Sequence, residues 1–438
     1  MISENKKYNI HAVILLSIGA IIRAIFIFFK NPPADYIFSD MKMYHDRAEK
    51  ILNGIWEPTT FFQPIGWTLI EAFSFINFSQ PYLFLSFLNL IASSLTMFFI
   101  WQASKNLLSE RVSLVVLAIS AFHFPFIYFS GFLLSECLFT FLISVFIWQV
   151  SRYDMPWNSK NSILLAVTFF LAFLLKGNFI FYPVILLLLL IWQNGLQAVK
   201  KLSIFFISFL ILLSAHGLLT LSTIGKFQMS ASNGGLNLVE GKCPYKYNVD
   251  PTGQWWQSPL FSMGGDEEKK HWPEPFTNSL YFTKQGLHCI TENPTVLLES
   301  FRYIPNLFIN NEMWPSLSSS SNPNFKITSK NYNLFFGFVM WPAILLSFFH
   351  LWSSRREKIF YSFVLPAISI FITVWVFKSE IRFRIPFDVV FIPLSVIGWD
   401  KLISTTFANT NEKHRFMIMY SFSFLVGSLV VFGLFVTS

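Results

Sequence analysis

Charged residues are scarce in this sequence: Asp, Glu, Lys and Arg make up 13% of its 438 positions, whereas 53% are hydrophobic and 54 residues are phenylalanine. That amount of apolar surface exceeds what the core of a soluble domain can bury, so the composition favours a membrane protein. The apolar blocks repeatedly reach about 18 residues, the length at which a helix crosses a hydrocarbon core of roughly 30 Å. The expected fold class is therefore an all-α polytopic membrane protein.

Cysteines are few in this sequence, and internal repeats are not found. Of three cysteines, Cys137 lies in an apolar block, while Cys243 and Cys289 lie in one long polar stretch. None has the spacing of a metal site. Cys243 and Cys289 could form a disulfide, which would fit an oxidising outer compartment, but the sequence does not give their distance. The absence of repeats and of paired broken helices weakens a transporter interpretation.

Eleven apolar segments, bounded by charged or turn residues, are expected to span the membrane. The first lacks the small-residue cleavage site of a signal peptide, so we expect it to be retained. The region around Lys176 is short for two crossings, but two short helices there keep the basic loops on the cytoplasmic side. The expected spans are 10–29, 81–103, 112–130, 134–150, 161–175, 179–193, 202–224, 331–352, 358–377, 385–403 and 415–436.

The net charge of +8 comes mainly from Lys and Arg in short loops, so it indicates orientation and not nucleic-acid binding. With a cytoplasmic N-terminus, two segments lie outside: a first outer loop at 30–80 and a long loop, 225–330, between spans seven and eight. The long loop is rich in Gly, Pro, Asn, Ser and Trp, which predicts an ordered, turn-rich segment. The chain then divides into an N-terminal transmembrane module (1–224), the long loop (225–330) and C-terminal transmembrane helices (331–438).

An amphipathic helix is predicted in the first outer loop, in "FSDMKMYHDRAEKILNG" at 38–54. Apolar residues recur there at helical spacing from Met41 to Leu52. Ser39 or Asp40 is positioned to cap the N-terminus, and Gly54 is positioned to end the helix. Capping is one interpretation of Asp40. The other is a general base, because a carboxylate fixed at the water boundary of a cavity is well placed to accept a proton.

Two more ionisable residues lie near other outer turns. Glu136 begins the fourth predicted span, and an ionisable residue within a span is a candidate for function. Its alternative is a residue near the interface that snorkels to water. Lys176 lies at the turn before the sixth span, where its ammonium group is available to a substrate phosphate.

The late segment "FKSEIRFRIPFD" carries cations on the outer side, where orientation does not explain them. Arg382 and Arg384 beside an apolar cavity suit a phosphate, which guanidinium groups bind in bidentate geometry. The alternative is pairing with Glu380 and Asp388 or with membrane lipid head groups. Acids at one turn and cations at others suit the transfer of a sugar from a lipid phosphate. A base takes the proton of the acceptor's hydroxyl as it attacks the anomeric carbon, and cations stabilise the departing phosphate.

Several short motifs occur in order across roughly residues 10 to 400. They are Asp40, Tyr44, Ala48 and Gly54 in the first loop, a Pro-x-Gly turn at Pro64 and Gly66, Ser135, Glu136, Leu138 and Phe139 at the fourth span, Lys176, a glycine-rich stretch from Gly225 to Gly241, and "RFRIP" at 382–386. Together they resemble the bacterial branch of the dolichyl-phosphate-mannose protein mannosyltransferase-like superfamily. These multi-spanning glycosyltransferases use polyprenyl-phosphate sugars and include the aminoarabinose transferases.

The resemblance implies an inverting transferase with Asp40 as base, a polyprenyl-phosphate sugar donor and a glycan, lipid or protein acceptor. It also implies a bacterial inner-membrane protein of the cell envelope, acting in lipopolysaccharide or protein glycosylation, with its site facing the periplasm or exterior. The candidate catalytic residues are Asp40 and Glu136. The candidate substrate-binding residues are Tyr44, Gln63, Lys176, Glu380, Arg382 and Arg384.

Three departures from the family pattern matter. The first loop has "SDM" where many relatives have paired acids, "KGN" replaces the usual Arg-Pro after the fifth span, and the signature ending the seventh span is missing. Metal use stays open, because some relatives hold a divalent cation near the first-loop acid and others need none. Two rival functions remain: a polysaccharide polymerase or ligase, in which Asp40 would be expendable, and a flippase or transporter of lipid-linked sugars.

Overall fold

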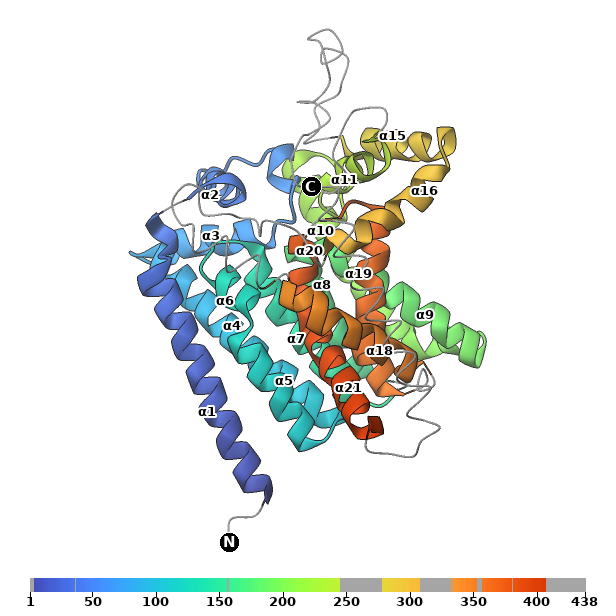
Figure 1. Cartoon of the computed structure of the whole chain (residues 1–438). Coiled ribbons are helices and arrows are strands. Elements are labelled where there is room, and N and C mark those ends of the chain that lie inside the picture. Colours follow the sequence, from blue (N-terminus) through green and yellow to red (C-terminus); the bar gives the residue numbers. More distant parts are fainter. Residues whose placement is uncertain are drawn as a thin grey trace.

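The structure is a computed structural model that describes residues 4–35, 37–155, 157–244, 278–307, 332, 334–352, 357–379 and 381–406. Every regular element in these ranges is helical, in agreement with the predicted all-α class. Long helices run side by side as a bundle, and a layer of shorter helices covers one end, opposite the N-terminus (Figure 1). We call this end the outer end, and the helices that cover it the outer layer.

The N-terminal half supplies most of the bundle. Helices α4 and α7 pack along each other, and so do α8 and α10. Arg23 of α1 is fully buried where α1 meets α4 and α5, and it donates to Ser93 Oγ (2.7 Å) and to three backbone carbonyls, which supply the hydrogen bonds that a buried cation needs. The helices are α1 (Glu4–Ile25), α4 (Pro81–Leu107), α5 (Glu110–Phe122), α6 (Phe124–Ser130), α7 (Ser135–Arg152), α8 (Ser159–Leu175), α9 (Phe181–Asn194) and α10 (Gln197–Ile224).

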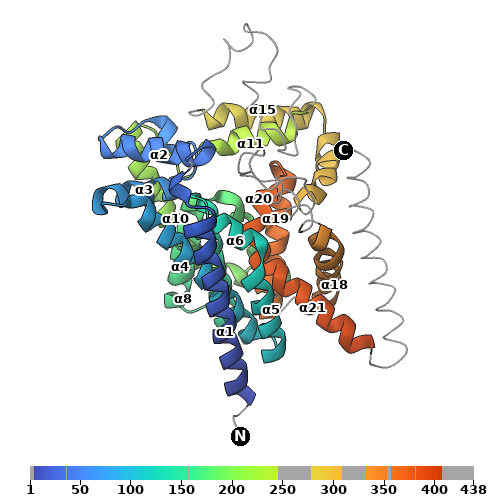
Figure 2. The same ribbon diagram turned by 60° about the vertical axis from the view of Figure 1, so that its left-hand side comes forward.

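The C-terminal half adds shorter helices that lie against this bundle (Figure 2). Helices α18 and α19 each carry a proline near their start, and each continues without a break from a π-helical turn, so the proline lies within a longer continuous helix and removes one of its backbone hydrogen bonds. The elements are η6 (Phe336–Met340), α18 (Trp341–Leu351), η7 (Phe360–Val364), α19 (Leu365–Val376), α20 (Ile381–Arg384), η8 (Ile385–Phe387) and α21 (Asp388–Thr406).

The predicted count of eleven spans is not supported. Among the described residues, four helices are long and apolar enough to cross a membrane, or five if the pair α5 and α6, bent by 46°, forms one span. Three of the other predicted spans, 161–175, 331–352 and 358–377, are apolar helices of 10 to 17 residues, too short by themselves for a full crossing. The division around Lys176 is observed, since α8 ends at Leu175 and the 3-10 turn η4 (Gly177–Phe179) precedes α9. The predicted span 415–436 lies outside the described residues.

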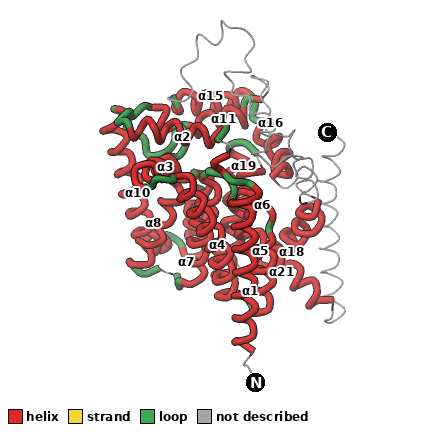
Figure 3. Tube along the Cα trace, turned by 90° about the vertical axis from the view of Figure 1, so that its left-hand side faces the viewer, coloured by secondary structure: helices red, strands yellow, loops and turns green. Residues whose placement is uncertain are grey.

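Both predicted outer loops contribute to the outer layer (Figure 3). They are joined directly, because the carbonyls of Phe61 and Phe62 accept hydrogen bonds from the amides of Ser232 and Asn233, both at 3.0 Å. The described parts of 225–330 are largely helical, so the expectation of a turn-rich loop is wrong for them. The elements are α2 (Ser39–Leu52), η3 (Pro58–Phe61), α3 (Gly66–Asn77), α11 (Asn233–Lys242), α15 (Ser279–Glu292), α16 (Thr295–Glu299) and η5 (Ser300–Leu307).

Helices α11 and α15 form one tight unit. Cys243 and Cys289 are joined in a disulfide with their Cα atoms 5.5 Å apart, which settles the pairing that the sequence left open. Gly235 allows the close approach, because a Cβ there would lie 2.2 Å from the carbonyl oxygen of Ser279. A small apolar cluster around the disulfide includes Phe62 of the first outer loop and so ties the two loops together.

Candidate functional site

Helix α2 packs on the bundle through the face that its apolar spacing predicts. Met41, Tyr44 and Ala48 are buried there. The helix ends as expected, because Gly54 follows the C-cap residue Asn53 with a φ of 71°, a left-handed conformation that glycine adopts without strain. Asp40 stands at the start of this helix, on the side of the bundle.

Asp40 does not cap α2. The N-cap residue is Phe38, which has no side-chain capping hydrogen bond, so the interpretation of Ser39 or Asp40 as the cap is wrong. The Asp40 carboxylate instead accepts a hydrogen bond from Nη1 of Arg382, which is 2.9 Å from Oδ2. The two side chains are 19% and 17% exposed, so the pair lies at the edge of the buried interior.

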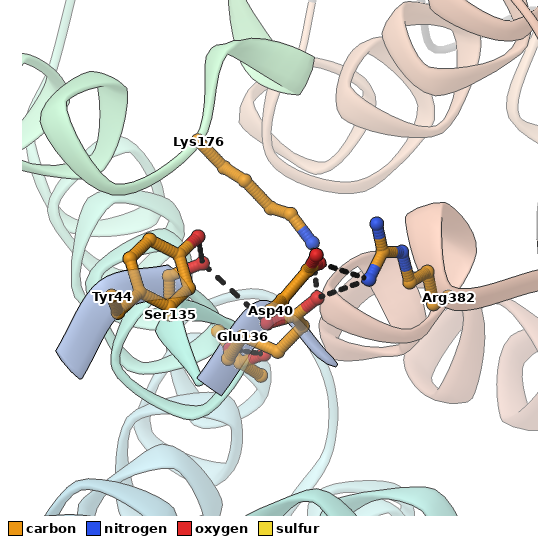
Figure 4. Close-up of polar contacts among 7 residues, drawn as sticks. Asp40, Tyr44, Ser135, Glu136, Lys176 and Arg382 are labelled. Carbon is orange, nitrogen blue, oxygen red and sulfur yellow. Dashed lines mark hydrogen bonds and ion pairs between the residues drawn. The ribbon is translucent and has the colours of Figure 1, made fainter. Parts of the chain in front are cut away.

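A second ion pair lies beside the first. Lys176 donates to Oε1 of Glu136, and Nη1 of Arg382 is 3.9 Å from the same oxygen. Glu136 is in the first turn of α7, and Lys176 is the extended residue between α8 and η4. Lys176 and Arg382 approach the two carboxylates from different sides (Figure 4). Two acids and two cations thus form one charge-balanced cluster, which we call the outer-end cluster.

The cations determine the protonation state of Asp40. Burial raises the pKa of this carboxyl. The charge and hydrogen bond of Arg382, the charge of Lys176 and a hydrogen bond from Gln63 together lower the pKa by more than burial raises it. The net pKa is below its ordinary value. Asp40 is therefore ionised at neutral pH and can accept a proton.

Neutral and aromatic groups line the cluster. The Tyr44 hydroxyl is 3.5 Å from Ser135 Oγ, and burial together with the charges of Glu136 and Asp40 raises the pKa of Tyr44. Gln63 Oε1 accepts a hydrogen bond from Nη1 of Arg47 at 2.8 Å, and Gln63 also borders a small pocket.

Arg47 is a site residue that the sequence reasoning missed. It is buried on the face of α2 that carries Tyr44, seven residues after Asp40. Residues at i, i+4 and i+7 share one helical face, so a cation at this position was the available signal. Its role here is to hold the side chain of Gln63.

Arg384 is not part of the outer-end cluster. Its guanidinium pairs with Asp388, with Nε 3.2 Å from Oδ1, and lies 4.0 Å from the ring centre of Phe336. His123, at the bend between α5 and α6, places Nε2 at 2.7 Å from Oδ2 of Asp388. The pairing of Arg384 with Asp388 that the sequence offered as an alternative is therefore observed. Glu380 lies outside the described residues.

No family model and no curated protein matches the sequence. Solved structures of the oligosaccharyltransferase of the archaeon Archaeoglobus fulgidus do match. Its apo form aligns with a TM-score of 0.51 at 15% identity, over 98% of this chain and 56% of that one. Its complex with an inhibitory peptide and dolichol-phosphate gives 0.51 and 15%, over 98% and 55%. The form tethered to an acceptor peptide gives 0.50 and 16%, over 96% and 53%.

These matches define the class of the fold. The chain is a helical membrane-type protein that shares the fold of this oligosaccharyltransferase along almost all of its own length. It spans about half the length of that enzyme.

Proposed function

We propose that this protein is an inverting glycosyltransferase that moves a sugar from a polyprenyl-phosphate donor to a lipid, glycan or protein acceptor. The observation that carries the proposal is the contact of Asp40 with Arg382 beside the pair of Glu136 and Lys176. A base and two phosphate-binding cations then share one site at the outer end. The likeness in fold to an oligosaccharyltransferase supports the same class of reaction.

The proposal gives each charged group a role. The ionised Asp40 accepts the proton of the acceptor's hydroxyl while the hydroxyl oxygen bonds to the anomeric carbon. The bond from that carbon to the phosphate oxygen breaks on the opposite face, which inverts the configuration. Polyprenyl phosphate leaves as an anion, stabilised by Lys176 and Arg382, and needs no proton from an acid. Glu136 holds Lys176 in place before the donor arrives.

Donor binding also makes Asp40 a stronger base. In the free protein the charge of Arg382 lowers the pKa of Asp40. A donor phosphate that binds Arg382 neutralises part of this charge, so the pKa of Asp40 rises towards its ordinary value. The base therefore gains basicity when the donor is bound.

A divalent cation has no step in this mechanism. Within the described residues, no group of three or more His, Cys, Asp and Glu side chains is arranged to hold a metal. Asp40 and Glu136 are the carboxylates that would offer oxygen ligands, and both are engaged by cations. One structure of the archaeal oligosaccharyltransferase is a complex with Zn and sulfate. Transfer activity measured with and without a chelator tests metal dependence.

The outer end is the face on which we place the reaction, in a bacterial inner membrane with the site towards the periplasm. The disulfide in the outer layer fits an oxidising compartment, and the basic loops are expected on the opposite side. The archaeal enzyme has been captured with an acceptor peptide and with dolichol-phosphate. A lipid-phosphate donor and a peptide acceptor are accordingly the first pair to test.

The test uses purified full-length protein, a polyprenyl-phosphate sugar labelled in the sugar, and membranes or peptides as acceptors. We expect labelled product with inverted anomeric configuration and one polyprenyl phosphate released per sugar transferred. A flippase would move the donor between leaflets of a vesicle without releasing polyprenyl phosphate. Product with retained configuration would overturn the inverting mechanism, and release of a diphosphate would point to the polymerase or ligase.

A further inference from the structure

Arg382 is carried by a short segment that has little regular structure of its own. Helix α19 ends at Val376, and α20 has only four residues before the turn η8. A segment this short is not stable alone, because most helical stability comes from packing. The position of the Arg382 side chain against Asp40 must therefore come from contacts on either side.

The contact on the N-terminal side is a buried ion pair with the outer layer. Lys378 Nζ lies 2.8 Å from Oε2 of Glu240 in α11, and the two side chains are 7% and 3% exposed. A charge at this depth is stable only when it is paired, so the two residues hold each other in one place. Lys378 is four residues before Arg382 in the same segment.

The backbone of the same segment is held by α11 as well. A Cβ at Gly241 would lie 1.6 Å from the carbonyl oxygen of Phe377, so the two backbones are in direct contact. Lys242 is buried and donates to Ser300 Oγ (2.5 Å) and to the carbonyl of Trp375. Helix α11 itself is fixed to α15 by the Cys243–Cys289 disulfide.

The contact on the C-terminal side is the pair of Arg384 and Asp388, which His123 extends to the bend between α5 and α6. Arg382 therefore lies between two buried ion pairs that belong to different parts of the fold. We propose that Lys378 and Glu240 are positioning residues, which couple α11 to the site by fixing the Arg382 guanidinium where it meets Asp40 and the donor phosphate. This inference rests on the proposed function only in naming the phosphate.

The first test is the affinity of the purified protein for polyprenyl phosphate in detergent. Lys378→Met and Glu240→Gln should each weaken binding by about tenfold, as expected when Arg382 is displaced and loses its charged hydrogen bond to the phosphate. In an Arg382→Gln background the same changes should alter affinity by about twofold or less, because the residue they position is gone. Lys42→Met, in an exposed ion pair with Asp46 on α2, is the matched control and should leave affinity unchanged.

An equal loss of affinity with and without Arg382 would overturn the inference, because Lys378 would then act independently of it. The second measurement needs no ligand: hydrogen exchange of the backbone amides of 381–387. Exchange should be faster in Lys378→Met and Glu240→Gln than in wild type, with α1 unchanged. Unchanged exchange at 381–387 would also overturn the inference. If wild type does not bind polyprenyl phosphate, the proposed function fails, and the exchange measurement alone decides the positioning role.

Discussion

The guanidinium of Arg382 donates a 2.9 Å hydrogen bond to the carboxylate of Asp40, although the two residues are 342 positions apart in the sequence. One lies in the first outer loop and the other near the last described helix, so only the folded bundle brings them together. The contact links the proposed base to a proposed phosphate ligand. It makes the protonation of Asp40 dependent on Arg382.

Replacement of Arg382 by Gln tests this dependence through the pH profile. Arg382 lowers the pKa of Asp40, so its loss should raise that pKa. A base is active when ionised, and the acid limb of kcat/KM should therefore move to higher pH in Arg382→Gln. We also expect kcat/KM to fall about 10- to 100-fold from the lost phosphate contact. Arg152→Gln, at the far end of α7, is the control. If the acid limb of Arg382→Gln stays at the wild-type pH, the protonation of Asp40 does not depend on Arg382.

Arg384 should behave differently from Arg382. Removing its charge leaves Asp388 buried beside His123 with one partner fewer, which typically costs about 3–5 kcal/mol. Arg384→Gln is therefore expected to lower the melting temperature in detergent, whereas Arg382→Gln is expected to leave it almost unchanged. The measurement is thermal unfolding of both variants beside wild type. Full stability together with lost polyprenyl phosphate affinity would instead make Arg384 a phosphate ligand.

The different places of these two arginines show what the sequence could not reveal. Both stand in "RFRIP", and chemistry alone suits both for phosphate. Residues two apart in a helical turn point roughly 200° apart, so one guanidinium faces the outer-end cluster and the other faces the interior. The turn at 381–384 is too short to give a periodic signal. Its orientation is set by packing against η5 and η8, and η8 in turn packs on α7 and α21.

The main members of the outer-end cluster could be predicted from sequence because each is an ionisable residue at or near one of the expected outer turns or loops. Asp40, Glu136, Lys176 and Arg382 all meet this description, and the structure brings them together. The sequence gives no such signal for Glu240, because acidic residues are common in polar stretches like the one in which it lies. Its burial arises from the contact of α11 with Lys378, a tertiary feature.

Glu71 in α3 predicts a dependence of stability on pH. Burial raises the pKa of this carboxyl to about 8 from an ordinary 4.5, and its Oε1 accepts a 2.7 Å hydrogen bond from Trp67 Nε1. An acid with a raised pKa contributes stability that is fully present below pH 4.5 and is lost as pH rises through 8. The loss is on the order of 5 kcal/mol. Glu71→Gln keeps the acceptor oxygen and should be more stable than wild type at pH 8.5 but not at pH 4.5, as thermal unfolding at both would show.

Two glycines in α11 form a matched pair for the contact with the Arg382 segment. A Cβ at Gly241 would lie 1.6 Å from the Phe377 carbonyl, whereas a Cβ at Gly234 meets nothing within 4 Å. Gly241→Ala should therefore displace α11 and reduce activity, and Gly234→Ala should be neutral or more stable by about 0.5–1 kcal/mol, the usual helical gain. Equal behaviour of the two variants in unfolding and transfer assays would show that the close contact does not matter.

The most direct measurement of the central claim is sugar transfer from a polyprenyl-phosphate donor by Asp40→Asn and wild type at matched protein levels. The change keeps the shape of the side chain and removes its ability to accept the acceptor's proton. Asp46→Asn, an exposed acid on the same helix, controls for loss of charge on α2. We expect Asp40→Asn to lose transfer by about 100-fold or more, as for loss of a general base, and Asp46→Asn to keep it. Unchanged transfer in Asp40→Asn would contradict the role of Asp40 as the base.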